Sequence, residues 1–501
     1  MAGLKGLTRQ YTRFFNKTLF FSIALLSVSQ FNFGFDLTAF TTTQAMDSFE
    51  RQFGEYNAEE NAWVLGDDFL ALLNGLPFLG FFFGLQFGSW ASSRWGRRHL
   101  MFSISVCGII TAIVTVTSCS RGQILAGRIL NYYYAGLELA VVPVFQSEIA
   151  PKQVRGLVVE SFSFMHYFGG LIMSLICLGT SNLEGNKQWQ IPFGLFCLVP
   201  LVIATGVYMM PELLMKGREE DAMIALIKLR AGCFTKEEKG TNWRRTWITC
   251  CVNILLQLTG NTFASRYGTI YVKSLKFRGI NPFHMTIINQ LVEVMGVVSS
   301  MCLIDRWGRR PMLLCGGAIQ IVMLLAMGFL DVPETTPGLQ QGILATFTIF
   351  GAGLSSGWSP VVHILTSEIP TSRLRDMTNR TAAGLGLCVG LATTFMTPYI
   401  KTKMGFVFGS GAIAATVFAY FYVPECKGRT LEEIDQLFIN KVSILSSYSI
   451  CNSNGNKNSD NKKNDNKKND NKKNDNKKNN NKNSDNKKND NSSSNELSHR
   501  H

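Results

Sequence analysis

Charge is scarce in this sequence. Only 17% of its 501 residues are Asp, Glu, Lys or Arg, whereas 46% are hydrophobic. Soluble globular chains carry about 25% charged residues, so this composition excludes a water-soluble body.

The patterns of several functional classes are also missing. The 12 cysteines include no C-x-x-C pair, which argues against a zinc or redox site and favours small buried hydrophobic residues. The basic residues are not interleaved with stacking aromatics, so we expect no nucleic-acid partner. Since no nucleophile–base set or cluster of metal ligands appears, we expect neither an enzyme nor a cofactor.

Long apolar runs are abundant instead. The runs "LALLNGLPFLGFFFGLQFG" (70–88) and "GAIQIVMLLAMGFL" (317–330) approach or reach the roughly 20 residues that a helix needs to cross a bilayer. One such run could be a buried helix of a soluble protein, but they recur along most of the chain. We therefore predict an all-α membrane protein with twelve transmembrane helices. The predicted spans lie near 17–40, 64–91, 99–118, 122–147, 157–180, 190–210, 246–273, 282–304, 312–331, 339–366, 378–399 and 405–423.

The distribution of charge predicts the orientation of these spans. Basic clusters such as "RWGRR" (94–98) and "DRWGRR" (305–310) fall in alternate loops, which marks those loops as cytosolic. The loop 46–61 is mostly acidic and faces outward, and both ends of the sequence face the cytosol. No signal-peptide cleavage site follows the first basic residues, so we expect no cleaved leader. The exceptions, which would face outward, are Lys273, Lys276, Arg278, Lys401 and Lys403.

The clusters occur in pairs about 210–220 residues apart. Arg94 returns as Arg306, and Glu148 of "SEIAPKQVR" returns as Glu368 of "SEIPTSRLR". Glu212 likewise returns as Glu425. Matched pairs in register indicate a duplicated six-helix unit. Transporters built from two such halves bind substrate near the bilayer midplane and rock one half against the other.

Two roles are open for these clusters. Arginines on cytosolic turns can pair with glutamates at nearby inner helix ends and hold the cytosolic mouth shut, each exposed pair contributing about 0–1 kcal/mol. Alternatively, the basic residues only enforce topology. The candidate gating residues are Arg94, Arg97, Arg98, Glu148, Arg155, Glu212, Asp305, Arg306, Arg309, Arg310, Glu368, Arg375 and Glu425.

These strings carry a family resemblance. "RWGRR", "VPVFQSEIAPKQVRG" (142–156), "PELLMKGR", "DRWGRRP", "SEIPTSRLR" and "VPECKGRTLEEID" (423–435) resemble signatures of the sugar porter family of the major facilitator superfamily, in its fungal branch. The resemblance covers about residues 15–440. It implies the major facilitator fold of two six-helix repeats, and a carrier of sugars, polyols or related acids that works by facilitated diffusion or proton symport.

The resemblance also divides the chain. It implies a cytosolic N-terminus (1–16), a six-helix half (17–210), a shortened cytosolic linker (211–245) and a second six-helix half (246–423). A cytosolic amphipathic segment (424–451) and an Asn/Lys/Asp-rich tail (452–501) follow. The tail repeats "NKKND" without apolar residues to bury, so we predict that it is disordered.

Ionisable residues inside spans are costly and therefore point to a role. "GFD" (34–36) resembles the family's Gly-aromatic-Asp, whose Asp in proton-coupled members faces an arginine at the start of span four. The matching residues are Asp36 and Arg128. They are either a proton-coupling pair or a purely structural ion pair. For Glu138, Glu160 and Glu293 structural pairing is the first interpretation, and His166 is expected to be a neutral hydrogen-bonding group.

The substrate residues follow from the same resemblance. "LQLTGNT" (256–262) matches the family's Gln-Gln-x-Ser/Thr-Gly-x-Asn at Gln257, with Leu256 in place of the first Gln and Thr262 in place of the Asn. His363 stands where many relatives carry a sugar-stacking tryptophan. The candidate substrate-binding residues are Ser163, Gln257, Asn261, Thr262, Trp358 and His363. In contrast, the small-residue steps at Gly80, Gly84 and Gly88 predict close helix packing.

The sequence therefore predicts a sugar or polyol carrier in the plasma membrane, coupled to protons. A nutrient sensor that resembles a transporter but does not transport, and an uncoupled facilitator, are the alternatives. Its expected partners are the small-molecule substrate, protons and the lipid bilayer.

Overall fold

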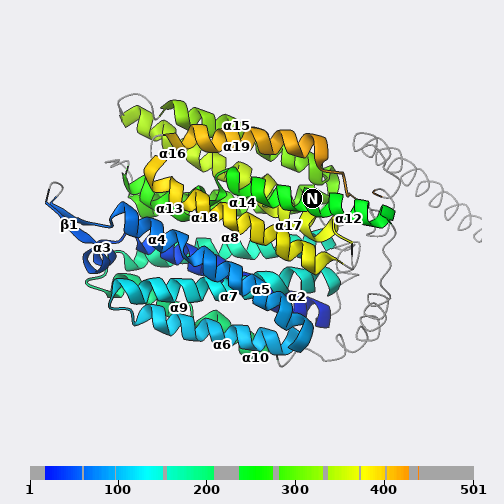
Figure 1. Ribbon diagram of the computed structural model, residues 1–501. Helices are drawn as coiled ribbons and strands as arrows, with labels where there is room; N and C mark the ends of the chain where they lie inside the picture. Colours follow the sequence, from blue (N-terminus) through cyan, green and yellow to red (C-terminus); the bar gives the residue numbers. More distant parts are fainter. Residues whose placement is uncertain are drawn as a thin grey trace, which may run out of the picture. The chain divides into compact units, whose positions relative to one another are not determined.

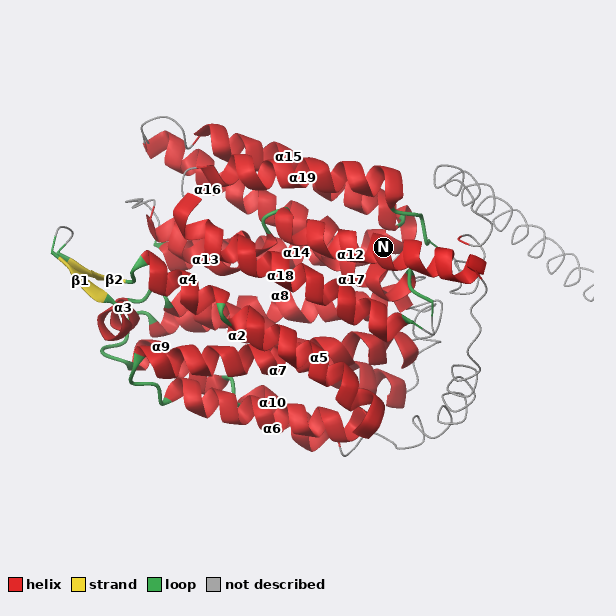
Figure 2. Ribbon diagram, viewed as in Figure 1, coloured by secondary structure: helices red, strands yellow, loops and turns green. Residues whose placement is uncertain are grey.

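The computed structural model describes residues 17–58, 61–95, 97–149, 155–207, 236–274, 281–330, 337–371, 374–400, 403–427 and Phe438. These residues are almost entirely helical (Figures 1 and 2). One antiparallel hairpin, β1 (Glu55–Asn57) and β2 (Ala62–Val64), is the sheet found in them. The predicted tail and most of the predicted linker lie outside the described residues.

The N-terminal half contains the six predicted spans. They are α2 (Lys17–Thr43), α4 (Asp67–Gly75) continued by α5 (Pro77–Trp95), α6 (Arg97–Val116), α7 (Arg121–Ile149), α8 (Arg155–Thr180), and α9 (Lys187–Leu195) continued by α10 (Leu198–Val207).

The C-terminal half also contains six spans. Its spans are α12 (Lys236–Leu258) with α13 (Asn261–Ser274), α14 (Pro282–Trp307), α15 (Arg309–Leu330), α16 (Pro337–Gly353) joined through the π-helical turn η1 (Leu354–Trp358) to α17 (Ser359–Glu368), α18 (Arg375–Ile400) and α19 (Met404–Tyr422). Helix α12 begins before the predicted span, inside the segment 211–245 that the sequence assigns to a linker.

Nine segments of the described chain are long and apolar enough by themselves to cross a membrane. The other three spans are broken or carry charge. Helix α7 contains the buried Arg128 and Glu138, α12 and α13 are interrupted at Gly260, and α16 and α17 are separated by η1. Buried charge and helix breaks therefore explain why these three spans fall short of a continuous apolar helix.

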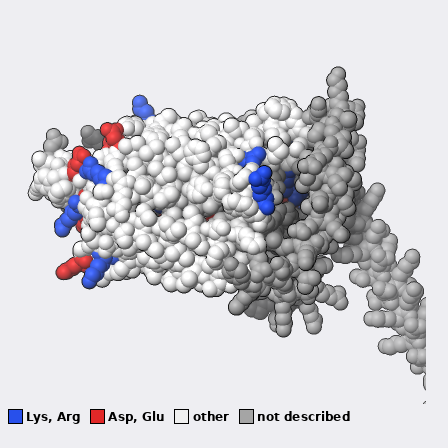
Figure 3. Space-filling view, turned by 60° about the horizontal axis from the view of Figure 1, so that its bottom comes forward, with Lys and Arg blue, Asp and Glu red and all other residues white. Residues whose placement is uncertain are grey.

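The surface of the bundle is suited to lipid. Large apolar side chains such as Phe83, Met295 and Phe329 are more than half exposed on helices of both halves. On the face shown in Figure 3, the Lys, Arg, Asp and Glu side chains gather near the two ends, and the surface between them is almost uncharged. An apolar band between charged ends is what a bilayer requires of a spanning protein.

The loop 46–61 is more ordered than the sequence suggests. It forms α3 (Asp47–Phe53) and leads into the β1–β2 hairpin, at the end of the bundle opposite to the start of α2 (Figure 1). Phe49 and Phe53 of α3 are fully buried and pack against Trp189 of α9. This apolar anchor explains why an acidic loop folds onto the bundle.

Helices α5 and α7 pack at very short distance. A β-carbon at Gly80 would lie 2.2 Å from the carbonyl oxygen of Ile129, and one at Gly84 would lie 2.1 Å from that of Tyr133. No larger side chain fits at these two positions. The predicted role of this glycine series in helix packing is thus confirmed.

Candidate functional site: a cavity between the two halves

A cavity of about 180 Å³ lies between the halves, and helices of both line it. The cavity residues with polar groups are Gln30, Thr38, Tyr132, Ser163, His166 and Tyr167 from the N-terminal half, and Asn253, Gln257, Asn261, Thr262, Ser265, Arg266, Gln290, Glu293, Ser359 and His363 from the C-terminal half. Apolar residues such as Phe33, Phe81 and Leu387 complete the wall. An apolar cavity with a set of convergent polar groups is typical of a small-molecule site.

Span seven is broken beside this cavity. Helix α12 ends at Leu258 and α13 begins at Asn261, with Gly260 between them at φ +89°. This backbone region suits glycine because it has no β-carbon to clash with the chain. Broken helices at the midplane of transporters expose groups to the substrate. Here Gln257 and Asn261, on either side of the break, both line the cavity.

We expect Gly260→Ala to destabilise the protein by about 1–2 kcal/mol, the usual cost of left-handed backbone for a residue with a β-carbon. The added carbon would also lie 3.3 Å from Phe408. The melting temperature of the purified protein measures this effect. Gly179→Ala is the matched control, because no atom lies within 4 Å of its added carbon. Equal melting temperatures for the two variants would show that the break tolerates a side chain.

Most predicted substrate residues come together in the cavity. Ser163, Gln257, Asn261, Thr262 and His363 line it. Thr262 shares a 3.0 Å hydroxyl–hydroxyl hydrogen bond with Thr393 of α18. The ring of His363 lies 5.8 Å from that of Phe162, so the pair joins α17 to α8 across the two halves.

Trp358 is the predicted substrate residue that does not line the cavity. Its side chain is fully buried in η1 and is not among the cavity-lining residues. A β-carbon added at Gly317 of α15 would lie 3.1 Å from its indole nitrogen, so the indole fills space that a glycine leaves. Stacking of Trp358 on a sugar ring stays a prediction, and in this conformation protein encloses the ring.

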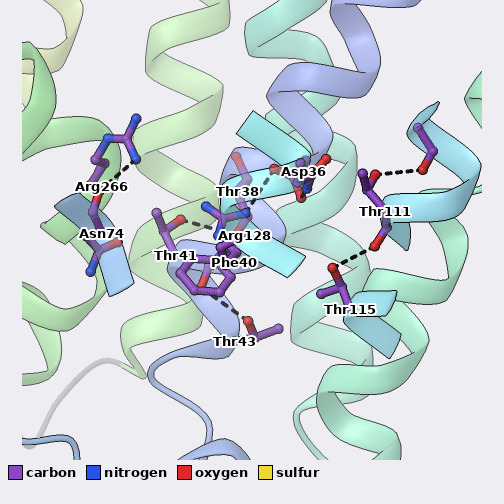
Figure 4. A network of polar contacts seen from close by, with 12 residues as sticks. Asp36, Thr38, Phe40, Thr41, Thr43, Asn74, Thr111, Thr115, Arg128 and Arg266 are labelled. Atoms are coloured by element: carbon purple, nitrogen blue, oxygen red, sulfur yellow. Dashed lines mark hydrogen bonds and ion pairs between the residues drawn. The ribbon is translucent and has the colours of Figure 1, made fainter. Parts of the chain in front are cut away.

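Asp36 and Arg128 form the ion pair that the sequence suggests. An Nη1 of Arg128 lies 3.0 Å from Oδ2 of Asp36, and both side chains are at least 95% buried (Figure 4). Asn131 donates a second hydrogen bond to the carboxylate, and the guanidinium lies 3.5 Å from the ring centroid of Phe40. Enclosed charges need such compensation, because desolvation costs several kcal/mol per ion.

The remaining ionisable residues of the spans have separate surroundings. Glu138 accepts hydrogen bonds from Ser29 and Tyr134, as its predicted structural role requires. Glu160 is buried on α8. Glu293 and His166 line the cavity, so both are in a position to face a ligand.

At the end of the C-terminal half where α15 begins, which the charge distribution predicts to be the cytosolic end, a glutamate and an arginine of the repeated clusters are paired. Nη2 and Nε of Arg309 donate to the two carboxylate oxygens of Glu368 at 3.0 and 3.2 Å. This bidentate pair is buried, and it joins the first residue of α15 to the last of α17. Paired arginine and carboxylate forks are among the stronger charged hydrogen bonds.

Glu425 is held by the backbone. Its carboxylate accepts hydrogen bonds from the N–H groups of Arg309 and Arg310, at 3.0 and 3.1 Å, where α15 begins. Helix N-termini favour negative charge because their first N–H groups lack partners within the helix. Gly308, at φ +103°, brings the chain close to this carboxylate. The sequence suggests a side-chain partner for Glu425, and the structure supplies main-chain donors.

The other described candidate gating residues differ in burial. Arg94 and Arg306 are exposed, while Arg310 and Arg375 are buried. Arg310 donates to the carbonyl oxygen of Tyr420 at 2.5 Å. The side chains of Arg97, Arg98, Glu148, Arg155, Asp305 and Glu212 lie outside the described residues.

At the opposite end, Lys273 connects the two halves. Its Nζ lies 2.7 Å from Oε1 of Glu50 on α3 and donates to the carbonyl oxygen of Ala45 at 3.0 Å. This lysine is one of the outward exceptions to the charge rule, and an acidic partner explains it. Burial raises the pKa of the Glu50 carboxyl, although the Lys273 ammonium opposes that shift and Asp47 adds to it. Because the pKa of Glu50 is raised in the folded protein, its contribution to folding stability falls as the pH rises through that pKa.

Arg266 is the charged residue of the described cavity lining that the sequence interpretation missed. It lies on α13, inside a predicted span, and is only 6% exposed. The rule that drew attention to Asp36, that charge inside a span is costly, also applies to it. Its guanidinium lies 4.1 Å from the ring centroid of Phe78 and 4.6 Å from that of Tyr132.

Twelve membrane-spanning helices in two six-helix halves, with a polar cavity between them, define a multi-pass secondary transporter fold of the major facilitator type. The chain belongs to the family described as "Sugar (and other) transporter", whose model matches residues 22–438. This membership places it among transporters and not among enzymes, as the sequence predicts.

Solved structures and curated relatives agree with this assignment. The proton:xylose symporter XylE, bound to 6-bromo-6-deoxy-D-glucose, superposes with a TM-score of 0.69 at 20% identity, over 84% of this chain and 99% of that one. The high glucose sensor RGT2 of Saccharomyces cerevisiae is 28% identical, with 74% of this chain aligned to 54% of the sensor. The hexose transporter HXT8 of the same yeast is 27% identical, over 79% of this chain and 77% of the transporter.

Proposed function

We propose that the protein carries a monosaccharide across the membrane by alternating access. The observation that supports this most directly is the cavity itself, since both halves line it. A site shared by two halves changes its exposure when one half moves against the other.

The lining suits a polyhydroxylated ring. Gln257 and Asn261 each bring a donor and an acceptor, as hydroxyl groups require, and Phe33 and Phe81 supply apolar surface. The volume of about 180 Å³ lies below the roughly 300–1,000 Å³ of pockets for drug-sized ligands, which favours a single small ring.

Proton coupling is the finer part of the proposal. The Asp36–Arg128 pair lies within the bundle, and Thr38, on the helix of Asp36, lines the cavity. A carboxylate whose contact with an arginine changes between conformations takes up a proton in one and releases it in the other. In our proposal Asp36 does this.

The inner network supports a gating role. Arg309, Glu368 and Glu425 join the ends of α15, α17 and the segment after α19. In our proposal, inward opening breaks these contacts and outward opening breaks the link between Lys273 and Glu50. Both sets of contacts are formed in the conformation described.

Uptake in a cell that lacks its own sugar carriers tests the proposal. We expect the chain to support accumulation of labelled D-glucose. Gln257→Ala should raise the half-saturation concentration about tenfold, because removal of a side chain that binds hydroxyl groups costs about 1–2 kcal/mol. Gln52→Ala is the control, since Gln52 bonds the carbonyl oxygen of Ser118 away from the cavity. Identical kinetics for Gln257→Ala and the parent would move the substrate site elsewhere.

A nutrient sensor is the second candidate. The observation in its favour is the 28% identity with a protein named as a high glucose sensor. A sensor binds sugar without moving it, so binding to the purified protein without uptake in the same cells would replace the carrier proposal. Because a carrier or a sensor of external sugar acts at the cell boundary, we further propose the plasma membrane as its location, which imaging of a tagged chain checks.

A further inference from the structure

Arg266 brings a positive charge to the wall of the cavity. It extends from α13 of the C-terminal half to residues of the N-terminal half, namely Asn74, Phe78 and Tyr132. Its Nη1 donates to the carbonyl oxygen of Asn74 at 3.4 Å, which is a long hydrogen bond (Figure 4). Thr262, one turn earlier on the same face of α13, lines the same cavity.

Among the contacts of the described residues, no carboxylate lies within ion-pair distance of this arginine. The carboxylate of Asp36 interacts with Arg266 electrostatically, but its ion pair is with Arg128 and it is also hydrogen-bonded to Asn131. Glu293 lines the cavity but forms no ion pair with Arg266 among the described contacts. The aromatic rings stabilise a cation through their faces, and this contributes about 0.5–2 kcal/mol. That is less than the several kcal/mol that desolvation of a charge costs.

We propose, on the basis of the carrier function above, that Arg266 selects a monosaccharide that carries a carboxylate, such as a uronic acid. A guanidinium has five N–H donors. In Arg266 one donates to Asn74 at long range and another is within hydrogen-bond reach of Tyr132, so donors remain for a ligand in the cavity. A carboxylate accepts two parallel hydrogen bonds from a guanidinium. Gln257, Asn261 and Thr262 then bind the hydroxyl groups of the same ring.

A carboxylate fits better than a phosphate. A sugar phosphate brings nearly two negative charges, whereas Arg266 supplies one positive charge. The second charge would be enclosed in the cavity without a cation to compensate it. A singly charged group matches the single guanidinium.

Two matched ligands test this inference. D-Glucuronate and D-glucose differ only at carbon 6, where one has a carboxylate and the other a hydroxymethyl group. Equilibrium binding to the full-length protein in lipid nanodiscs near neutral pH should show about tenfold tighter binding of D-glucuronate, which corresponds to about 1.4 kcal/mol. Arg266→Gln should remove this preference by weakening D-glucuronate binding more than D-glucose binding, and Arg266→Lys should retain part of it.

Lys273→Gln is the control variant. It removes a cation from the same helix, but one that is bound to Glu50 outside the cavity. The ratio of the two affinities should equal that of the parent. The melting temperature of each variant without ligand identifies any variant that does not fold. If Arg266→Gln does not fold, Arg266→Lys is compared with the parent instead.

The outcomes separate the two proposals. If D-glucose binds as tightly as D-glucuronate, or if Arg266→Gln weakens both ligands alike, Arg266 serves only to join the halves and the inference is wrong, while the carrier proposal stands on D-glucose uptake. If neither ligand binds the parent, the carrier proposal and the inference are both wrong.

Discussion

Asp36→Asn should abolish uphill accumulation of substrate while exchange of labelled for unlabelled substrate across the membrane continues. An amide cannot take up and release the proton that drives accumulation, yet it keeps the shape of the carboxylate and its contact with Asn131. Counterflow in proteoliposomes measures exchange, and accumulation under an imposed pH gradient measures coupling. Coupled uptake should fall to the level of the uncoupled exchange.

The variant also leaves Arg128 buried and without its ion-pair partner. Removing one partner of a buried ion pair lowers folding stability by about 3–5 kcal/mol, so we also expect reduced expression of this variant. The double variant Asp36→Asn with Arg128→Gln removes the unpaired charge and should recover stability without recovering coupling. Glu184→Gln, in an exposed loop, is the control for neutralising a carboxylate.

Two results would contradict this view of Asp36. If Asp36→Asn still concentrates substrate with the proton influx of the parent, the pair is structural only. If the parent itself neither concentrates substrate nor moves protons, the protein is a facilitator or a sensor.

Glu368→Ala should destabilise the inner end of the C-terminal half by about 3–5 kcal/mol, because it leaves the buried Arg309 guanidinium without its bidentate partner. In the fraction of the variant that folds, we expect the conformational equilibrium to shift toward the inward-open state. The labelling rate of a single cysteine introduced on the cytosolic side reports this shift, and the melting temperature reports the loss of stability.

Arg306→Ala is the matched control from the same motif. Arg306 is exposed, and exposed ion pairs contribute about 0–1 kcal/mol. We therefore expect little change in stability and less change in labelling than for Glu368→Ala. Equal effects of the two substitutions would mean that burial does not decide which arginine of the motif gates the carrier.

The twelve spans were predictable because apolar runs of sufficient length have few alternatives to crossing a bilayer. The Asp36–Arg128 contact was predictable from the family resemblance, which pairs the Asp of "GFD" with an arginine at the start of span four, and pairing lowers the cost of two charges inside spans. The paired motifs also indicated that arginines of the clusters contact glutamates at helix ends, and the structure shows that Arg309 and Glu368 form such a pair.

Other features depend on three-dimensional contacts that spacing does not encode. The burial of Trp358 results from the small residue opposite it on α15, and Glu425 binds main-chain groups that every sequence possesses. Lys273 contradicts the charge rule until its contact with Glu50 is seen. Arg266 was within reach of the rule on charges in spans, but its place in the cavity wall requires the bend at Gly260.

The contact between α5 and α7 determines how the N-terminal half is able to deform. At Gly80 and Gly84 the two backbones already touch, so neither helix can approach the other or slide past it without collision. A pair of helices locked in this way transmits displacement without absorbing it. Movement of α5 at the cavity should therefore carry α7 and its Arg128 along, so that the cavity wall and the buried charge change position together.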